Sequence, residues 1–140
     1  MQWFIVESAN RPGELARNLE AIAQRRINLA NILCLALGDR GGAALYATDE
    51  AGLRQALDDA GVKFHEVAGL GVKIEDRPGQ AAVAARSLAD AGVNIELFAP
   101  VDMTDGHVTV AIGVDKLDAA RKALGDRVTE VSMGMVGSHL

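Results

Sequence analysis

Two short turns in this sequence carry residue types that can bind a small charged ligand. They are Asn10-Arg11-Pro12-Gly13 and Asp76-Arg77-Pro78-Gly79. If each turn begins a helix, the unpaired N–H groups of the first helical turn attract a carboxylate. An Asn side chain adds an oxygen that accepts from ammonium and an NH₂ that donates to carboxylate. Glycine lets a ligand approach the backbone closely, so the turns predict a site for a zwitterion.

The two turns belong to an internal repeat. Its offset is 66 residues, the separation of Asn10 from Asp76. The other matching pairs at this offset are Ile27-Asn28-Leu29 with Val93-Asn94-Ile95, and Asp49 with Asp115. A fixed offset indicates copies of one structural unit. The sequence therefore predicts a first domain over residues 1–67, a short linker over residues 68–71 and a second domain over residues 72–140.

Hydrophobic spacing predicts the order β-α-β-β-α-β in each copy. In the first copy, strands are expected at 3–8, 27–37, 43–48 and 62–67, and helices at 13–26 and 50–60. In the second copy, strands are expected at 70–74, 93–101, 108–114 and 128–133, and helices at 80–91 and 116–124. The fold class is α+β, with a four-stranded antiparallel sheet per copy and both helices on one face.

Local signals refine these elements. Asn10 is expected to cap the first helix, with Pro12 in its first turn. The buried face of that helix is expected at Leu15, Leu19, Ile22 and Ala23. Gly61 and Gly92 are expected to end helices, and Asp105-Gly106 predicts a type I′ hairpin turn.

The element order, Arg-Pro-Gly at the first strand-to-helix turn and Asn at the start of the second strand together resemble the ACT domain. The resemblance covers the whole chain as two tandem, free-standing copies. It implies ferredoxin-like domains that bind amino acids and regulate enzymes of amino-acid metabolism. In ACT domains that bind serine, the Asn before Arg-Pro-Gly and the Asn of the second strand contact the ligand. The resemblance thus implies these binding residues: Asn10, Arg11, Pro12, Gly13, Asn28, Asp76, Arg77, Pro78, Gly79 and Asn94.

Geometry predicts how these residues combine. Asn10 and Asn28 are expected at opposite ends of one sheet, about 17–20 Å apart, which is too far for one small ligand. We therefore expect crossed sites, Asn10 with Asn94 and Asp76 with Asn28, either within one chain or between chains. Asp76 departs from the motif, because an ionised carboxylate only accepts hydrogen bonds and repels a ligand carboxylate.

Each signal also has a purely structural interpretation. Asn10 and Asp76 could be helix caps only, and Asn28 and Asn94 could be turn residues. Gly13 and Gly79 could permit tight packing of helix on sheet, and Arg11 and Arg77 could be solvated side chains. Cys34 is expected to be a small buried hydrophobic residue.

Composition limits the class of function. A net charge of −5 gives no basic surface for nucleic acid. The single cysteine forms no intrachain disulfide, which suits a reducing compartment such as the cytoplasm. The sequence shows no signal peptide, membrane span, metal-ligand spacing, phosphate loop or catalytic constellation, so no cofactor is expected.

The sequence thus predicts a non-catalytic, cytoplasmic regulatory protein that binds a free amino acid at domain interfaces. We expect a homodimer formed through the sheet or its edge, and a partner among the enzymes or regulators of amino-acid metabolism. One alternative is a protein interaction module that has kept the fold without the ligand. The other alternative is an enzyme on a ferredoxin-like scaffold.

Overall fold

The computed structural model describes residues 1–131, which form two compact units. Within the described residues, the N-terminal unit is Gln2–Glu66, and the C-terminal unit comprises Met1 and residues 67–131. The boundary between them falls inside one strand, β4 (Phe64–Glu75).

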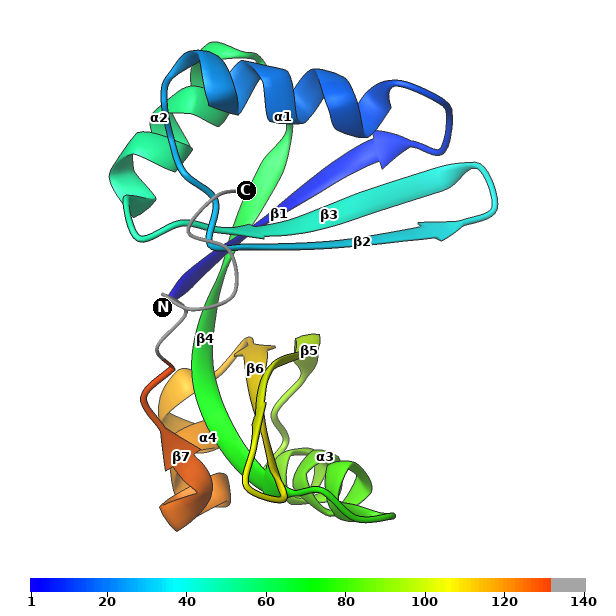
Figure 1. The fold of residues 1–140 in the computed structure, drawn as a ribbon. Helices are drawn as coiled ribbons and strands as arrows, with labels where there is room; N and C mark the ends of the chain where they lie inside the picture. Colours follow the sequence, from blue (N-terminus) through cyan, green and yellow to red (C-terminus); the bar gives the residue numbers. More distant parts are fainter. Residues whose placement is uncertain (132–140) are drawn as a thin grey trace. The chain divides into compact units, whose positions relative to one another are not determined.

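The N-terminal unit contains β1 (Gln2–Ala9), α1 (Glu14–Gln24), β2 (Asn31–Leu37), β3 (Arg40–Tyr46), α2 (Glu50–Asp59) and the start of β4. Strand β3 is central and pairs antiparallel with β1 and with β2. Both helices cover the same face of these strands (Figure 1). The core lies between the layers, where Phe4, Val6 and Leu45 of the sheet meet Ile22 of α1 and Leu53 of α2.

The C-terminal unit contains the rest of β4, α3 (Gln80–Asp90), β5 (Ile95–Thr104), β6 (His107–Val114), α4 (Leu117–Leu124), a 3₁₀ turn (Gly125–Arg127) and β7 (Val128–Thr129). Strand β6 pairs antiparallel with β4 and β5, and β7 pairs with the other side of β4. Its core joins Leu70 and Val72 of β4 and Ile112 of β6 to Leu88 of α3 and Leu124 of α4.

Several predictions of turns and helix ends are confirmed. Asp105 and Gly106 both have positive φ, 51° and 71°, as a type I′ turn requires. Gly61 and Gly92 follow helices α2 and α3 with φ of 66° and 67°. The predicted last strand ends at Met133, outside the described residues; β7 is described over Val128–Thr129.

The expected linker at residues 68–71 is wrong as secondary structure, because these residues lie within β4. The glycines that suggested a loop are paired in the sheet, Gly69 with Gly113 and Gly71 with Ala111. A Cβ on Gly71 would lie 2.6 Å from the backbone oxygen of Thr129 in β7. Glycine there permits close approach of a neighbouring strand rather than a turn.

The expected start of the first helix is one residue too early, and its expected buried face is only partly right, because Ile22 is buried and Leu19 packs against the core but Ala23 is exposed. Helix α1 begins at Glu14, because Gly13 has left-handed backbone geometry. Its buried residues are Glu14, Asn18 and Ile22, whereas Leu15 is exposed. The helix therefore turns two polar side chains toward the sheet. Among residues 1–131, no helix is long and apolar enough to cross a membrane.

Candidate functional site

The two strand-to-helix turns have the same backbone geometry. Gly13 is the N-cap of α1 and Gly79 is the N-cap of α3, each with φ 89° and ψ −13°. Neither helix has a side-chain cap, so Asn10 and Asp76 do not cap them as expected. By contrast, the Asp49 side chain caps α2 by accepting from the Gly52 N–H at 2.9 Å. The Glu14 and Gln80 N–H groups donate to the Arg11 and Arg77 carbonyls at 3.4 Å, and the other first-turn N–H groups of α1 and α3 keep the capacity to bind an acceptor.

Backbone conformation explains both glycines. A φ of 89° disfavours any residue with a Cβ. A Cβ added at Gly13 or at Gly79 would meet nothing within 4 Å. The glycines therefore do not serve tight packing of helix on sheet, and the space beside each of them is open.

Each turn is fixed to the tip of the neighbouring hairpin. The Asn10 N–H donates to the Asp39 carbonyl at 2.9 Å, and the Asp76 N–H donates to the Gly106 carbonyl at 2.8 Å. The Asn10 side-chain Nδ2 also donates to the Gly38 carbonyl at 2.8 Å. Asn10 thus uses an NH₂ hydrogen on the fold, which leaves its side-chain oxygen as the acceptor for a ligand.

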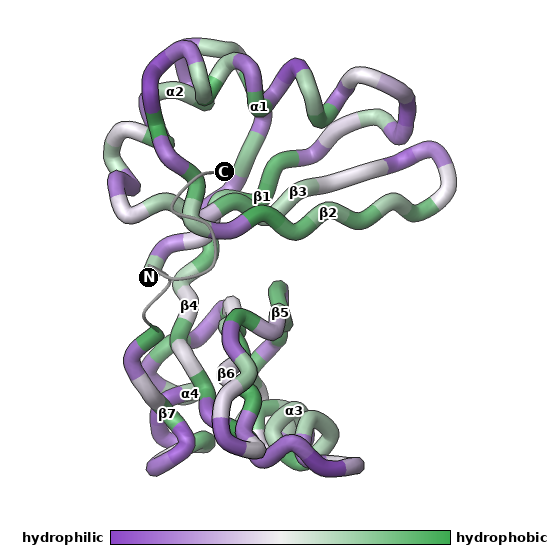
Figure 2. The backbone as a smooth tube through the Cα atoms, viewed as in Figure 1, coloured by the Kyte–Doolittle hydropathy of each residue, from purple (hydrophilic) through white to green (hydrophobic). Residues whose placement is uncertain are grey.

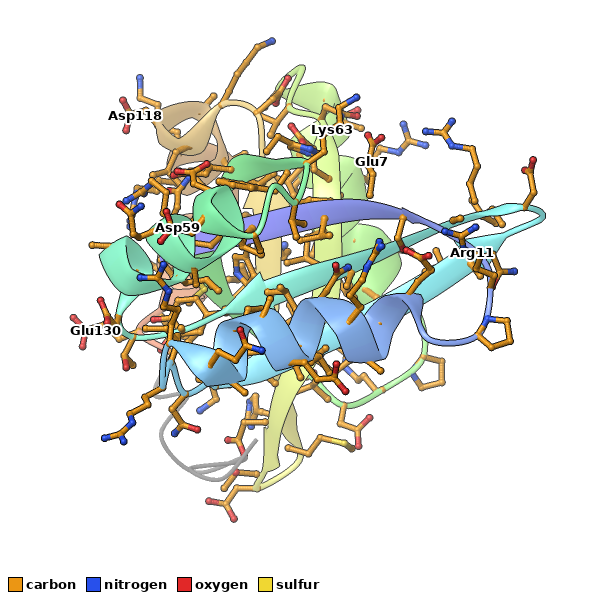
Figure 3. The ribbon with its side chains drawn as sticks, turned by 90° about the horizontal axis from the view of Figure 1, so that it is seen from above. Glu7, Arg11, Asp59, Lys63, Asp118 and Glu130 are labelled. Atoms are coloured by element: carbon orange, nitrogen blue, oxygen red, sulfur yellow. The ribbon has the colours of Figure 1, made fainter. Side chains whose placement is uncertain are left out.

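Charged side chains surround the first turn. The Arg11 side chain projects from the turn between β1 and α1 (Figure 3). Glu14, at the start of α1, accepts from Arg11 Nε at 2.6 Å and from Arg17 Nη2 at 2.8 Å. The hydrogen bond from Arg11 lowers the pKa of the Glu14 carboxyl, and the charges of both arginines act in the same direction. The group carries net positive charge, which favours an anion beside α1.

In the second turn the arginine is directed elsewhere. Arg77 pairs with Glu75 of β4, and this hydrogen bond lowers the pKa of the Glu75 carboxyl. The position that corresponds to Glu14 holds Gln80, so no equivalent cluster of two arginines and one carboxylate forms. Asp76 and Pro78 are exposed, as Pro12 is in the first turn.

A pocket lies beside the first turn, between α1 and the edge of the sheet at β2; we call it the α1–β2 pocket. Its cavity volume is about 190 Å³. Its lining comprises Ser8, Ala9, Asn10, Arg11, Glu14, Leu15, Asn18, Cys34, Leu35, Ala36, Gly41, Gly42 and Ala43. Two of the predicted binding residues, Asn10 and Arg11, therefore border a hollow that the sequence did not predict.

Asn18 is the most informative residue of this pocket. It is 6% exposed, yet its side chain makes no hydrogen bond within residues 1–131. No side-chain nitrogen or oxygen in those residues is both fully enclosed and unpaired. The Asn18 amide therefore faces the open space of the pocket. Comparing the repeats would have revealed it, because the corresponding residue in the second copy is Ala84.

A second hollow of about 390 Å³ lies on the other side of α1, toward the end of α2. It shares Ser8, Ala9, Arg11, Glu14 and Asn18 with the α1–β2 pocket. Its charged lining also includes Glu7 and Lys63, which are on neighbouring backbone segments (Figure 3). Asn18 thus lies between two hollows that flank the first turns of α1.

The two asparagines of the second strands lie away from these turns. Ala9, at the end of β1, is level with Leu37, whereas Asn28 precedes the opposite end of β2. Six residues of strand separate Asn31 from Leu37, about 20 Å at the usual rise. Asn10 and Asn28 therefore do not share a small ligand within the N-terminal unit. In the C-terminal unit the Asn94 N–H donates to Asp115 Oδ1 at 2.8 Å.

Two further observations concern chemistry. Cys34 is an exposed free thiol, so the prediction that it is buried is wrong. The reason is that β2 is an end strand, where α1 leaves part of the helix-facing surface uncovered.

Within residues 1–131, no group of three or more His, Cys, Asp or Glu side chains could hold a metal ion.

Solved structures share this fold. A protein from Bacteroides thetaiotaomicron is similar with a TM-score of 0.69 at 22% identity, covering 88% of this chain and 85% of that one. The regulatory subunit of aspartate kinase from Thermus thermophilus has a TM-score of 0.61 at 22% identity, covering 90% of each chain. The same subunit from Thermus flavus has a TM-score of 0.58 at 21% identity, covering 88% of each.

The sequence matches no protein-family model and no curated protein. The likeness to the three structures therefore concerns the fold. It supports the α+β fold that the sequence predicted, with antiparallel strands and helices packed on them in each unit.

Proposed function

We propose that this chain is a non-catalytic, cytoplasmic regulatory protein, built from two ACT domains in tandem, that binds a free amino acid. The observation that carries the proposal is the repeated turn, in which Gly13 and Gly79 begin uncapped helices with the same φ and ψ. Both turns have this left-handed glycine conformation, which residues with a Cβ adopt at a cost, and both glycines lie beside open space. An uncapped helix start is suited to a carboxylate.

The first turn has complementary groups for both ends of an amino acid. The carboxylate would bind the first-turn N–H groups of α1 beside the Arg11 guanidinium. The ammonium group would donate to the side-chain oxygen of Asn10, whose NH₂ is already engaged with Gly38. The second turn is weaker in this respect, because Asp76 replaces Asn and the charge of Arg77 is balanced by Glu75, whereas Arg11 and Arg17 share the single carboxylate of Glu14.

We retain crossed sites as part of the proposal, with Asn10 beside Asn94 and Asp76 beside Asn28. Within the N-terminal unit, the separation of Asn10 from Asn28 supports the crossing. A ligand held by two domains would stabilise one arrangement of them, and a partner could recognise that arrangement. Regulatory subunits of aspartate kinase share the fold. By analogy we propose an enzyme or regulator of amino-acid metabolism as the partner.

The test is a thermal-shift screen of the purified chain against the twenty amino acids, followed by isothermal titration of any that raise Tm. Ligand at a hundredfold excess over Kd stabilises the folded state by about 2.7 kcal/mol. We expect a clear rise for one or two amino acids, and Asn10→Ala should reduce it. A flat screen together with no heat in titration would refute the proposal.

The exposed leucines of β2 favour a second candidate, a module that associates through its sheet edge. Leu35 and Leu37 are 68% and 73% exposed on an end strand of the sheet. Figure 2 shows β2 as a continuous hydrophobic stretch. An exposed apolar edge strand is a template for pairing. We propose a second copy of this chain as its occupant, because two β2 strands related by a two-fold axis would place the same leucines together.

Sedimentation analysis of the native chain and of Leu35→Lys tests this candidate. The substitution places a charge on the edge without changing the core, so we expect a dimer for the native chain and a monomer for the variant. A native chain that remains monomeric at high concentration would contradict the pairing. An unchanged dimer in the variant would place the interface elsewhere.

A further inference from the structure

The two copies of the repeat differ in the layer between the first helix and the sheet. In the N-terminal unit, Ser8 of β1 is paired with Gly41 of β3. In the C-terminal unit, Ile74 of β4 is paired with Val108 of β6. The pairs correspond, because each lies two residues beyond a matching core pair, Val6 with Ala43 and Val72 with Val110.

The facing helix shows the same difference. Asn18 of α1 corresponds at the offset of 66 to Ala84 of α3. Ala84 is fully buried in the core of its unit, which includes Ile74 and has Val108 packed against it. One copy therefore fills this space with apolar side chains. The other copy has a hydroxyl, a glycine and an amide around a hollow of about 190 Å³.

We propose that the α1–β2 pocket receives a small polar ligand and that the Asn18 amide is its principal recognition group. The inference rests on the proposed function, because it identifies where an amino acid binds and which amino acids fit. The Asn18 amide faces the open space of the pocket and makes no hydrogen bond within residues 1–131, so its donor and its acceptor are available to a bound molecule. A ligand that pairs with Asn18 gains this hydrogen bond, whereas in the C-terminal unit the equivalent space is already occupied.

The lining defines the class of ligand. Its volume is below the roughly 300–1,000 Å³ of drug-sized sites, which indicates a molecule smaller than a drug. Arg11 and the start of α1 suit a carboxylate at one end. Ala36, Gly41 and Ala43 give an apolar wall without bulk. The Asn18 amide and the Ser8 hydroxyl can each donate and accept. The pocket thus fits a small, uncharged side chain, as in alanine, serine or threonine, and excludes aromatic amino acids.

The consequence is one ligand per chain through this pocket, despite two copies of the turn. In the C-terminal unit the described hollow near the turn, about 250 Å³, is lined by charged side chains such as Lys73, Asp126 and Arg127. Gln80 lines this hollow with a carboxamide that can be removed as a matched control. Neither Ala84 nor Val108 lines it.

Titration calorimetry with glycine, alanine, serine and threonine compares the native chain with Asn18→Ala and Gln80→Ala. We expect one tight site per chain for the native protein, since the second turn is the weaker one. Asn18→Ala should weaken binding about tenfold, the effect of one hydrogen bond, whereas Gln80→Ala should leave it unchanged. Because the Asn18 side chain makes no hydrogen bond within residues 1–131, Asn18→Ala should not lower Tm of the free protein. A role in folding alone would give a lower Tm with unchanged affinity.

Cys34 supplies a second readout on the native chain. It lines the pocket and is the only cysteine in the sequence. Saturating ligand should slow its reaction with a thiol reagent severalfold. Gly41→Val should block binding without loss of folding, since a Cβ at Gly41 meets Ser8 Oγ at an ordinary 3.5 Å and its φ is not positive.

The outcomes separate this inference from the proposed function. If no amino acid binds the native chain by calorimetry or thermal shift, both fail. If an amino acid binds but Asn18→Ala and Gly41→Val have native affinity and Cys34 is not protected, only the pocket is refuted. Two equal sites per chain would also overturn it. Weakened binding in Asn18→Ala together with Cys34 protection supports it.

Discussion

The matched turn glycines allow a controlled test of what each turn contributes. Gly13→Ala and Gly79→Ala make the same change at the same φ and ψ. A Cβ meets nothing within 4 Å at either position, so neither substitution introduces a clash. The stability cost is therefore purely conformational and should be equal in the two variants.

The magnitude follows from two opposing terms. A left-handed conformation costs a residue with a Cβ about 1–2 kcal/mol. Replacing glycine by alanine restricts the unfolded chain and returns about 0.4–1 kcal/mol. The net loss is about 1 kcal/mol, which lowers Tm by about 4–8 °C for a domain of 60–100 residues. Urea denaturation followed by far-UV circular dichroism measures both variants on the same scale.

Ligand binding should then separate variants that are equal in stability. Gly13 lies in the turn that borders the α1–β2 pocket, whereas Gly79 lies in the turn of the copy whose interior is filled. We expect affinity to fall at least severalfold in Gly13→Ala and to remain native in Gly79→Ala. Stability losses that differ by more than about 1 kcal/mol would refute the conformational reasoning. Equal losses of affinity would refute the functional difference between the turns.

Two further predictions concern stability. Arg26 has a φ of 57° where the second copy has Gly92 at 67°. Arg26→Gly should therefore stabilise the protein by about 0.5–1 kcal/mol in urea denaturation, and Gly92→Arg should destabilise it by a similar amount. Changes of the opposite sign would refute the comparison. The hydrogen bond from Arg54 lowers the pKa of Glu66 from its ordinary 4.5, so its stabilisation is complete above that pH and disappears as the pH falls through the lower folded pKa. Denaturation midpoints between pH 3 and 7 should show a shallower acid loss in Glu66→Gln, and an unchanged slope would refute it.

The element order could be predicted because its signals are local. Gly61, Gly92 and Asp105-Gly106 impose backbone conformations that few other residues adopt, and each has the expected positive φ. Residues 68–71 were misread for a non-local reason. Gly71 accommodates β7, which is more than fifty residues later in the chain, and no local pattern distinguishes such a glycine from a loop glycine.

The candidate site was only partly predictable. The motif identified Asn10 and Arg11, which do border a pocket. Asn18 was missed because the apolar spacing placed Leu15 on the buried face, whereas Leu15 is exposed and Asn18 is buried. The left-handed N-cap at Gly13 sets where α1 begins, and the helix then turns Glu14 and Asn18 toward the sheet. Which side chains of a helix face the sheet depends on where its first turn is fixed, and the spacing of apolar residues alone does not show that position.

The hollow in the N-terminal unit has an energetic consequence. Burying a side chain such as Ile or Val contributes about 1.5–3 kcal/mol, and the C-terminal unit has Ile74 and Val108 where the N-terminal unit has Ser8 and Gly41. Without ligand, the N-terminal unit should therefore be the less stable of the two, although both have the same element order.

Hydrogen exchange followed by mass spectrometry measures this difference segment by segment. We expect α1 and β3 to exchange faster than α3 and β6 in the free protein, because opening of the less stable unit exposes its amides more often. Ligand at a hundredfold excess over Kd returns about 2.7 kcal/mol, which is close to the lower limit of the roughly 3–6 kcal/mol that the two missing side chains would supply. Protection should then rise in α1 and β3 and leave α3 and β6 nearly unchanged. A uniform rise in both units would mean that the ligand does not act through the hollow of the N-terminal unit.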